Sequence, residues 1–177
     1  MGASDRGATS IRLRPATEDD IRKFVAWRYE PPYDAYDITT DPEAEVQYFL
    51  RADVHCHMLV EGGEVVGYCT FGRDARVPGG DYSVEAVDIG LGVEPSRTGS
   101  GDGHRFVAAV VDRAKEMFSP EFLRVTIAAG NQRALRVWSN AGFGEVTRFA
   151  TDRTPMGSSE FVILVREAGA KVAGRPG

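Results

Sequence analysis

The sequence predicts an α/β fold in which a mixed, mostly antiparallel central sheet is flanked by helices. Stretches with strand-like alternation and stretches with helix-like spacing of apolar residues follow one another in the order β α α β β β α β α β β. The chain has 177 residues, 42% of them hydrophobic, which is ample for the core of a single domain. We therefore expect one domain over residues 10–167, between a disordered N-terminal tail at 1–9 and a flexible C-terminal tail at 168–177.

Capping residues and alternation indicate the first strand and the first two helices. Residues 11–14 alternate as a strand, and Thr17 then caps a helix whose first turn is acidic. A second helix begins at Asp41 as its N-cap, with a proline in the first helical position. Between these helices, residues 29–37 (YEPPYDAYD) cannot be helical through their adjacent prolines and are expected to form an aromatic, acidic loop.

A β-hairpin is expected next. Residues 55–60 and 64–71 have the pattern of two strands around a Gly-Gly turn. His55 and His57 would share one strand face, with Cys56 on the other. Because the spacing supplies no third or fourth ligand, we expect both histidines to be structural or exposed and no metal to be bound.

The second half of the chain centres on a strand, a glycine-rich turn and a long helix. Residues 83–93 are expected to form the central strand, and apolar residues at helical spacing continue to Phe118, where Ser-Pro ends the helix. Asn131 caps a last helix, which Gly142 ends. The remaining strands are expected at residues 122–128, 143–150 and 160–165, the last two joined by a turn at 155–157.

Three glycines at alternate positions, Gly99, Gly101 and Gly103, stand between the central strand and the long helix. Glycine permits positive φ and close approach of a ligand, and the first amides of a helix favour anions. We interpret Gly99 to His104 as a pyrophosphate cradle. A P-loop would need Lys and then Ser or Thr where His104 and Arg105 stand, and the dinucleotide fingerprint has a different glycine spacing.

Composition narrows the function classes. The net charge of −5, from 21 basic and 26 acidic residues, argues against a nucleic-acid surface and is compatible with a cationic acceptor. Cys56 and Cys69 do not make a disulfide framework, which suits a reducing cytoplasm. No apolar run reaches the roughly 18 residues of a membrane span, so we expect no membrane association and a cytoplasmic location.

Two motifs resemble those of the GNAT superfamily of N-acetyltransferases. The stretch from Val93 to Gly103 (VEPSRTGSGDG) is similar to the family's acetyl-CoA loop, Gln/Arg-x-x-Gly-x-Gly/Ala, with Thr98 at the Gln/Arg position and Arg97 one place early. Residues 131–143, N-x-x-A-x-x-V-W-x-x-x-G-F, look like the second signature. The resemblance covers about residues 10–166. It implies a GNAT-like sheet whose central strand splays from its neighbour at a bulge.

The resemblance implies transfer of an acetyl group from acetyl-CoA to a primary amine of a small molecule or peptide, by direct attack through a tetrahedral intermediate. The amide of Val93 is the candidate oxyanion donor. The alternative is a CoA-binding regulatory module without catalysis. The residues implied to bind the cofactor are Leu91, Gly92, Val93, Thr98, Gly99, Ser100, Gly101, Asp102, Gly103, His104, Asn131, Ala134 and Trp138.

Two acids and an unusual tryptophan bear on proton transfer. The candidate general bases are Asp88 and Glu85, with Asp88 slightly favoured because an acid commonly stands at its position in similar proteins; a base relayed through water is left open. Many GNAT enzymes have a tyrosine acid where Trp138 stands here, and an indole cannot donate a proton at neutral pH. The general acid is therefore open between Ser139, Tyr82 and water.

The loop at 29–37 has two interpretations. It is either a packed connector or a lip over the acceptor site, since the segment between the first two helices commonly lines the acceptor cleft in GNAT proteins. In the second case Tyr33 and Tyr36 would supply walls, and Asp34 and Asp37 would attract an ammonium group. The resemblance also makes a homodimer possible.

Overall fold

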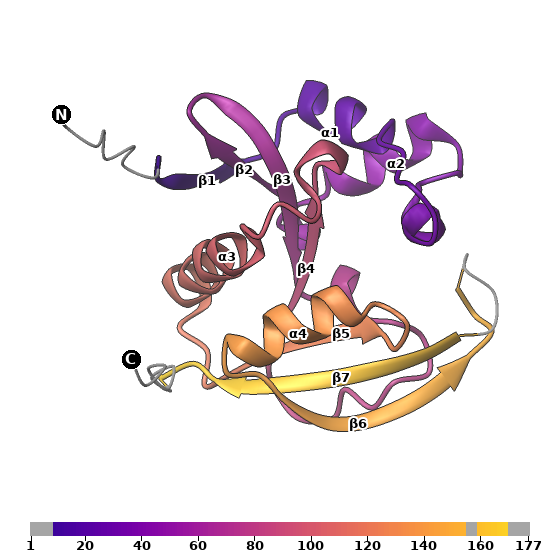
Figure 1. Cartoon of the computed structure of the whole chain (residues 1–177), viewed down its shortest axis with the longest axis vertical. Helices are drawn as coiled ribbons and strands as arrows, with labels where there is room; N and C mark the ends of the chain where they lie inside the picture. The colour runs from indigo at the N-terminus through magenta and orange to yellow at the C-terminus, as the bar shows by residue number, and fades with distance from the viewer. Residues whose placement is uncertain (1–8, 155–158, 170–177) are drawn as a thin grey trace, which may run out of the picture.

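The computed structural model describes residues 9–154 and 159–169 of the chain (Figure 1). The predicted turn at 155–157 and most of the two expected tails lie outside these residues. The strands are β1 (Ile11–Pro15), β2 (His57–Glu61), β3 (Glu64–Phe71), β4 (Val87–Val93), β5 (Phe122–Ala128), β6 (Gly144–Thr151) and β7 (Ser159–Glu167). The α-helices are α1 (Glu18–Val25), α2 (Pro42–Phe49), α3 (Gly103–Phe118) and α4 (Gln132–Asn140).

The seven strands form one sheet in the order β1-β2-β3-β4-β5-β7-β6. Every neighbouring pair is antiparallel except β4 and β5, which run parallel. The predicted α/β class, with a mixed and mostly antiparallel sheet between helices, is therefore confirmed, as is the predicted order of elements.

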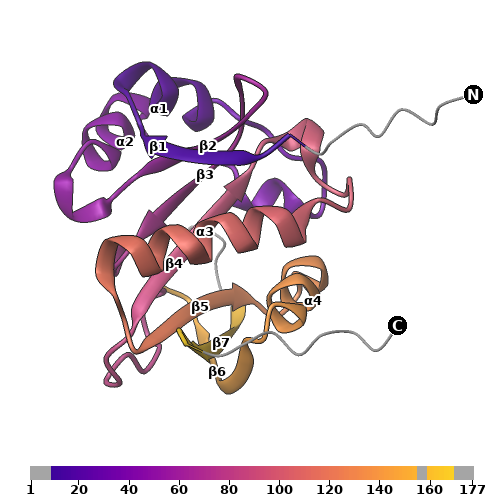
Figure 2. The ribbon, with the colours of Figure 1, turned by 90° about the vertical axis from the view of Figure 1, so that its left-hand side faces the viewer.

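Helices cover both faces of the sheet, and α3 lies on the opposite side of β3 and β4 from α1 and α2 (Figures 1 and 2). On β4, Ile89 and the other odd-numbered residues pack with Val107 and Val110 of α3 in the larger apolar cluster. The second cluster joins α1 and α2 to the other face, where Phe24 stacks on Tyr68 with ring centroids 4.0 Å apart. Burial of these apolar side chains is the main force that holds the helices against the sheet.

The two predicted N-caps of the first helices are present. Thr17 and Asp20 form a capping box at the start of α1, and the side chain of Asp41 accepts hydrogen bonds at the start of α2. Asp20 also pairs with Arg14 of β1 at 2.5 Å. The Arg14 guanidinium, with help from Thr17, holds the pKa of Asp20 well below its usual range.

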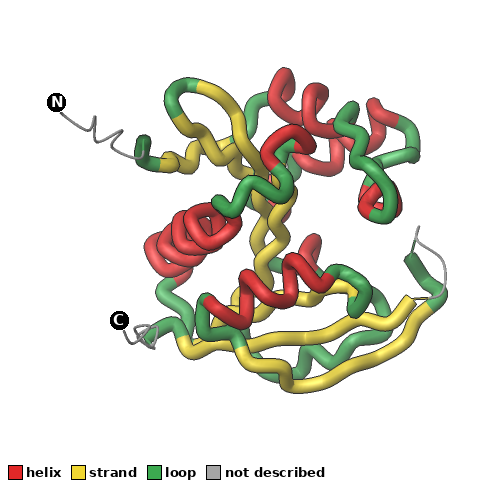
Figure 3. The backbone as a smooth tube through the Cα atoms, viewed as in Figure 1, coloured by secondary structure: helices red, strands yellow, loops and turns green. Residues whose placement is uncertain are grey.

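The sheet is split between β4 and β5. These strands pair only at Val87 with Leu123 and at Asp88 with Arg124, whereas β4 stays paired with β3 up to Val93. Figure 3 shows the strands of the two halves running apart from this point. The expected splay of the central strand is thus confirmed. The bulge expected on this strand is not found: the β3–β4 register is continuous, and the register shift lies one pair away, between β2 and β3 at Leu59/Val60.

Two local predictions differ from the structure. The central strand begins at Val87 and not at 83, because the Val84 carbonyl accepts a hydrogen bond from the Arg124 Nη1 at 2.7 Å and so faces a side chain, not a neighbouring strand. His55 has a left-handed backbone (φ 48) ahead of β2, so it does not share a strand face with His57. His57 is buried, with Nδ1 2.7 Å from the His55 carbonyl.

Both cysteines, Cys56 and Cys69, are buried free thiols. Among residues 9–154 and 159–169, no three His, Cys, Asp or Glu side chains come together as a potential metal site. Within the same residues, no helix has both the length and the apolar character needed to cross a membrane.

Candidate active site

The split leaves one edge of β4 unpaired. The Asp88 carbonyl and the Glu94 N–H bond to backbone groups on the β3 side. Because alternate residues of a strand point their backbone groups to opposite sides, Leu91 and Val93 direct their N–H and C=O groups into the split. The hydroxyl of Tyr29 donates to the Val93 carbonyl at 2.9 Å, which agrees with this direction. The Val93 N–H therefore faces an opening, as an oxyanion donor must.

The glycine-rich turn brings unpaired amides to the mouth of the split. Gly99 and Gly101 have φ of 74° and 89°, a conformation that side-chain-bearing residues rarely adopt. The N–H groups of 99–101, and those of the first two residues of α3, have no hydrogen-bond partner among the described residues. With the positive end of the α3 dipole behind them, they form an anion-binding surface.

Arginines strengthen this surface, and sequence reasoning missed the most important of them. The guanidinium of Arg133 lies over the Tyr33 ring at 4.3 Å, and its Nη1 is 3.1 Å from where a Cβ on Gly99 would be. Arg97 also lines the cavity and pairs with Glu61. Arg133 stands in the first turn of α4, where a positive charge is unfavourable because that end of the helix dipole is itself positive. This unfavourable placement is the sequence feature that could have indicated a functional role for Arg133.

A first cavity of about 460 Å³ extends from this turn along the unpaired edge of β4. The tyrosines Tyr29 and Tyr68, which sequence reasoning also missed, form part of its wall. Asp102 and His104 of the predicted cradle do not line it. Of the predicted residues, those that line it are Leu91, Gly92, Val93, Thr98, Gly99, Ser100, Gly101, Gly103, Asn131, Ala134, Trp138, Tyr33 and Tyr36.

A second cavity, of about 480 Å³, lies beneath the segment 75–78 and between β4 and β5. Five residues line both cavities, and we call this shared boundary the junction. The junction consists of Tyr36, Leu91, Asn131, Ala134 and Trp138.

Asn131 organises the junction from the start of α4. Its Oδ1 accepts the Ala134 N–H at 3.1 Å as the predicted N-cap, and its Nδ2 donates to the Tyr36 hydroxyl at 3.2 Å. Burial raises the pKa of the Tyr36 phenol, so the phenol stays protonated at neutral pH. Trp138 is buried and packs edge-to-face on Phe143, with centroids 4.9 Å apart.

The chain matches the family described as "Acetyltransferase (GNAT) domain" over residues 10–144. The chain belongs to the GNAT acetyltransferase family. The resemblance inferred from the two motifs is thereby confirmed. A search of curated proteins gave no match to this acetyltransferase.

Solved structures of other acetyltransferases share the fold. A chimera of spermidine N-acetyltransferase SpeG from Vibrio cholerae with hSSAT has a TM-score of 0.73 at 11% identity, covering 90% of this chain and 96% of that one. The putative acetyltransferase yncA from Salmonella typhimurium, determined with acetyl-CoA, has a TM-score of 0.64 at 17% identity, covering 93% and 97%. Ribosomal-protein-alanine N-acetyltransferase from Brucella melitensis has a TM-score of 0.66 at 20% identity, covering 88% and 99%.

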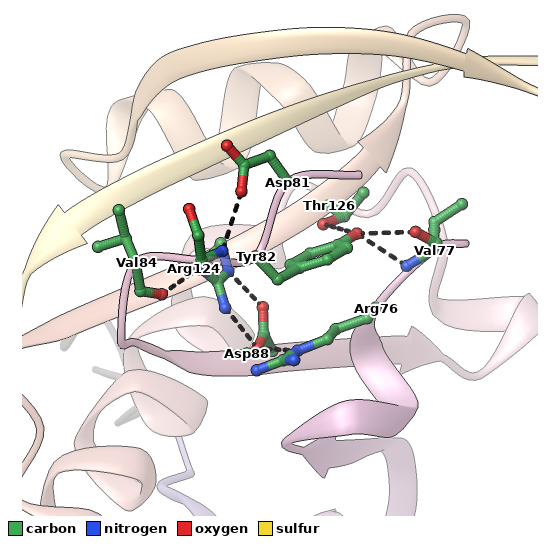
Figure 4. Close-up of polar contacts among 9 residues, drawn as sticks. Arg76, Val77, Asp81, Tyr82, Val84, Asp88, Arg124 and Thr126 are labelled. Atoms are coloured by element: carbon green, nitrogen blue, oxygen red, sulfur yellow. Dashed lines mark hydrogen bonds and ion pairs between the residues drawn. The ribbon is translucent and has the colours of Figure 1, made fainter. Parts of the chain in front are cut away.

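The acetyltransferase holds Asp88 away from both cavities, in a buried ion-pair network at the base of the split (Figure 4). Arg124 donates to both carboxylate oxygens of Asp88, at 2.6 and 2.9 Å, and Arg76 donates to one of them at 2.8 Å. Both guanidiniums also contact the ring of Tyr82, with Cζ atoms 5.1 Å (Arg76) and 4.9 Å (Arg124) from its centroid. With its oxygens occupied, Asp88 is suited to joining the two half-sheets and not to taking a proton. Glu85 is exposed and also lines neither cavity.

The acids of the 29–37 loop also lie away from the two cavities. Asp37 accepts the Tyr29 N–H at 2.9 Å and has a longer contact of 4.0 Å with Arg28, and Asp34 lines neither cavity. The tyrosines of the same loop, Tyr33 and Tyr36, do line the first cavity. The loop thus brings aromatic rings, and not carboxylates, to the site of the acetyltransferase.

Proposed function

We propose that this acetyltransferase transfers the acetyl group of acetyl-CoA to a primary amine of a small molecule or peptide. The proposal rests on one cavity that is lined by two sets of backbone groups without backbone hydrogen-bond partners among the described residues. Free amides at 99–101 and 103 lie at one end, and the open edge of β4 at Leu91 and Val93 lies along its side. The acetyl-CoA bound to the yncA protein, on the same fold, supports this reading.

The residues present fit the cosubstrate. The amides of Gly99 to His104 would hold the diphosphate, with positive charge from Arg97 and Arg133 nearby. The β4 edge would pair with the amides of the pantetheine arm, as an added strand would. Trp138 would form an apolar wall for the sulfur end. The turn has no Cβ at 99 or 101, so backbone and phosphate can approach closely.

When bound, acetyl-CoA supplies a thioester carbonyl that an amine nitrogen can attack. In the balanced reaction the N–C bond forms, the C–S bond breaks, the amine loses a proton and the sulfur gains one. The Val93 N–H would stabilise negative charge on the carbonyl oxygen. No carboxylate of the described residues lines either cavity, so we infer that the amine releases its proton through water.

Tyr36 is our candidate for the proton donor to sulfur. It is the junction residue with an ionisable hydroxyl, a phenol is protonated at neutral pH, and Asn131 orients this one by a hydrogen bond. It would take the role of the tyrosine that many GNAT enzymes have where Trp138 stands in this chain.

The free thiols Cys56 and Cys69 bear on the location of the protein. Because free thiols persist in a reducing compartment, we infer a cytoplasmic location.

Calorimetry and a turnover assay test the proposal together. We expect heat when acetyl-CoA is titrated into the protein, and CoA release with at least one class in a panel of amino acids, polyamines and N-terminal peptides. Absence of binding heat would refute the cavity assignment. Tight binding of CoA with no turnover on any amine would instead indicate a regulatory module.

A further inference from the structure

The second cavity has a positive wall. The charged side chains among its described lining residues are Arg76 and Arg153, and no carboxylate is among them. A cavity of about 480 Å³ that ends at the junction has the size of a small-molecule site and reaches the place where acetyl transfer would occur. Its charge therefore bears on which amine it accepts.

Arg153 is the cation that the surrounding protein leaves unneutralised. Arg76 shares the carboxylate of Asp88 with Arg124, and the exposed Asp81 interacts with Arg124 as well (Figure 4). These two acids balance those two arginines. The guanidinium of Arg153 has no ion pair or hydrogen bond with any described residue.

The geometry around Arg153 holds it at the rim of this cavity. Its backbone N–H donates to the Thr151 hydroxyl at 3.2 Å, at the end of β6, and its Nη2 is 3.3 Å from where a Cβ on Gly79 would be. The guanidinium therefore lies beside Gly79, directly after the segment 75–78 that covers the cavity. A planar guanidinium matches a carboxylate through two parallel hydrogen bonds, whereas an ammonium group would be repelled.

We propose that the second cavity binds the acceptor and that Arg153 selects amines that also carry a carboxylate, such as α-amino acids. This inference rests on the proposed acetyl transfer and refines its acceptor. It replaces the cationic acceptor expected from the net charge and from the loop acids. Arg76, already engaged by Asp88, adds positive potential without being the recognition group.

The test compares acceptors that differ only in charge. Several L-α-amino acids are each paired with their own carboxamide, and spermidine is the cationic control. Arg153→Gln removes the guanidinium, and Arg153→Lys keeps a charge without the planar fork. Arg148→Gln is the matched control, because Arg148 is an exposed arginine of β6, close to Arg153 in sequence, and pairs with Glu145 and Glu160.

We expect the unaltered enzyme to prefer an amino acid over its carboxamide. In Arg153→Gln the KM for the amino acid should rise about 10- to 100-fold, as for a lost charged hydrogen-bonded pair, with the KM for acetyl-CoA unchanged. Arg153→Lys should recover part of this loss, and Arg148→Gln should show none. Calorimetric titration of the amino acid into the protein–CoA complex should show the same ranking without turnover.

Preference for the carboxamide or for spermidine, or equal behaviour of Arg153→Gln and Arg148→Gln, would overturn this inference and leave acetyl transfer standing. If no amine is acetylated, the proposed function fails together with it. The acetyl-CoA titration then shows whether the cradle assignment fails too.

Discussion

The anion cradle makes a quantitative prediction at Gly101. Gly101→Glu places a carboxylate on the turn proposed to hold the diphosphate, at a position with open space around it. Because φ is 89° there, any side chain costs about 1–2 kcal/mol of folding free energy, whatever its charge. Gly101→Ala shares this strain and lacks the charge, so it is the matched control.

The size of the electrostatic effect follows from distance and solvent exposure. With an effective dielectric constant of about 40 to 80, two unit charges roughly 6 Å apart repel by about 0.7 to 1.4 kcal/mol. Two phosphate charges double that value. We therefore expect acetyl-CoA to bind Gly101→Glu about 10- to 100-fold more weakly than Gly101→Ala.

Isothermal calorimetry measures this ratio, and thermal unfolding checks that both variants lose equal stability. The ratio should shrink as salt rises from 0.05 to roughly 0.5 M, because the charges are exposed and screened. Equal affinities of the two variants at low salt would refute the reasoning, since the diphosphate would then lie elsewhere.

Three further predictions concern the junction, the base of the split and the first helix. Tyr36→Phe should lower kcat about 10- to 100-fold with unchanged acetyl-CoA affinity, measured by steady-state kinetics; an unchanged kcat would remove Tyr36 as the acid. Arg124→Met leaves Asp88 buried with one cation fewer, and should lower the unfolding free energy by about 3 kcal/mol in urea titrations; a loss below about 1 kcal/mol would contradict the structural role. Asp20→Asn should cost about 1 kcal/mol at pH 7, because Arg14 is 45% exposed. Since the folded-state pKa of Asp20 is depressed, its stabilisation exists above the ordinary value of 3.8 and is lost as pH falls towards the folded-state pKa, so native and variant stabilities should converge in acid. Parallel curves across that pH range would be contrary evidence.

Features governed by local rules were predictable from sequence. Thr17, Asp41 and Asn131 cap helices because a short polar side chain reaches the next free amides, whatever the rest of the fold does. Gly99 and Gly101 adopt positive φ for an equally local reason. These rules located the helices and the glycine-rich turn, whereas Leu91, Gly92, Val93, Ala134 and Trp138 in the wall of the first cavity came from the resemblance to the GNAT superfamily.

Features that depend on distant partners were not predictable in the same way. The environment of Asp88 is set by Arg124, 36 positions later on the next strand, and by Arg76 from a loop. Nothing near Asp88 in sequence indicates that both its oxygens are occupied. Likewise, Arg153 reaches the second cavity only because β6 ends beside Gly79 and the segment 75–78.

The split between β4 and β5 has a consequence for the order of events. The two cavities share only the junction residues, so donor and acceptor would occupy separate spaces and could be bound at the same time. Neither Cys56 nor Cys69 lines this passage, which leaves no thiol there to carry the acetyl group between half-reactions. Initial-rate plots should therefore intersect, the pattern of a ternary complex, and not run parallel as in ping-pong exchange.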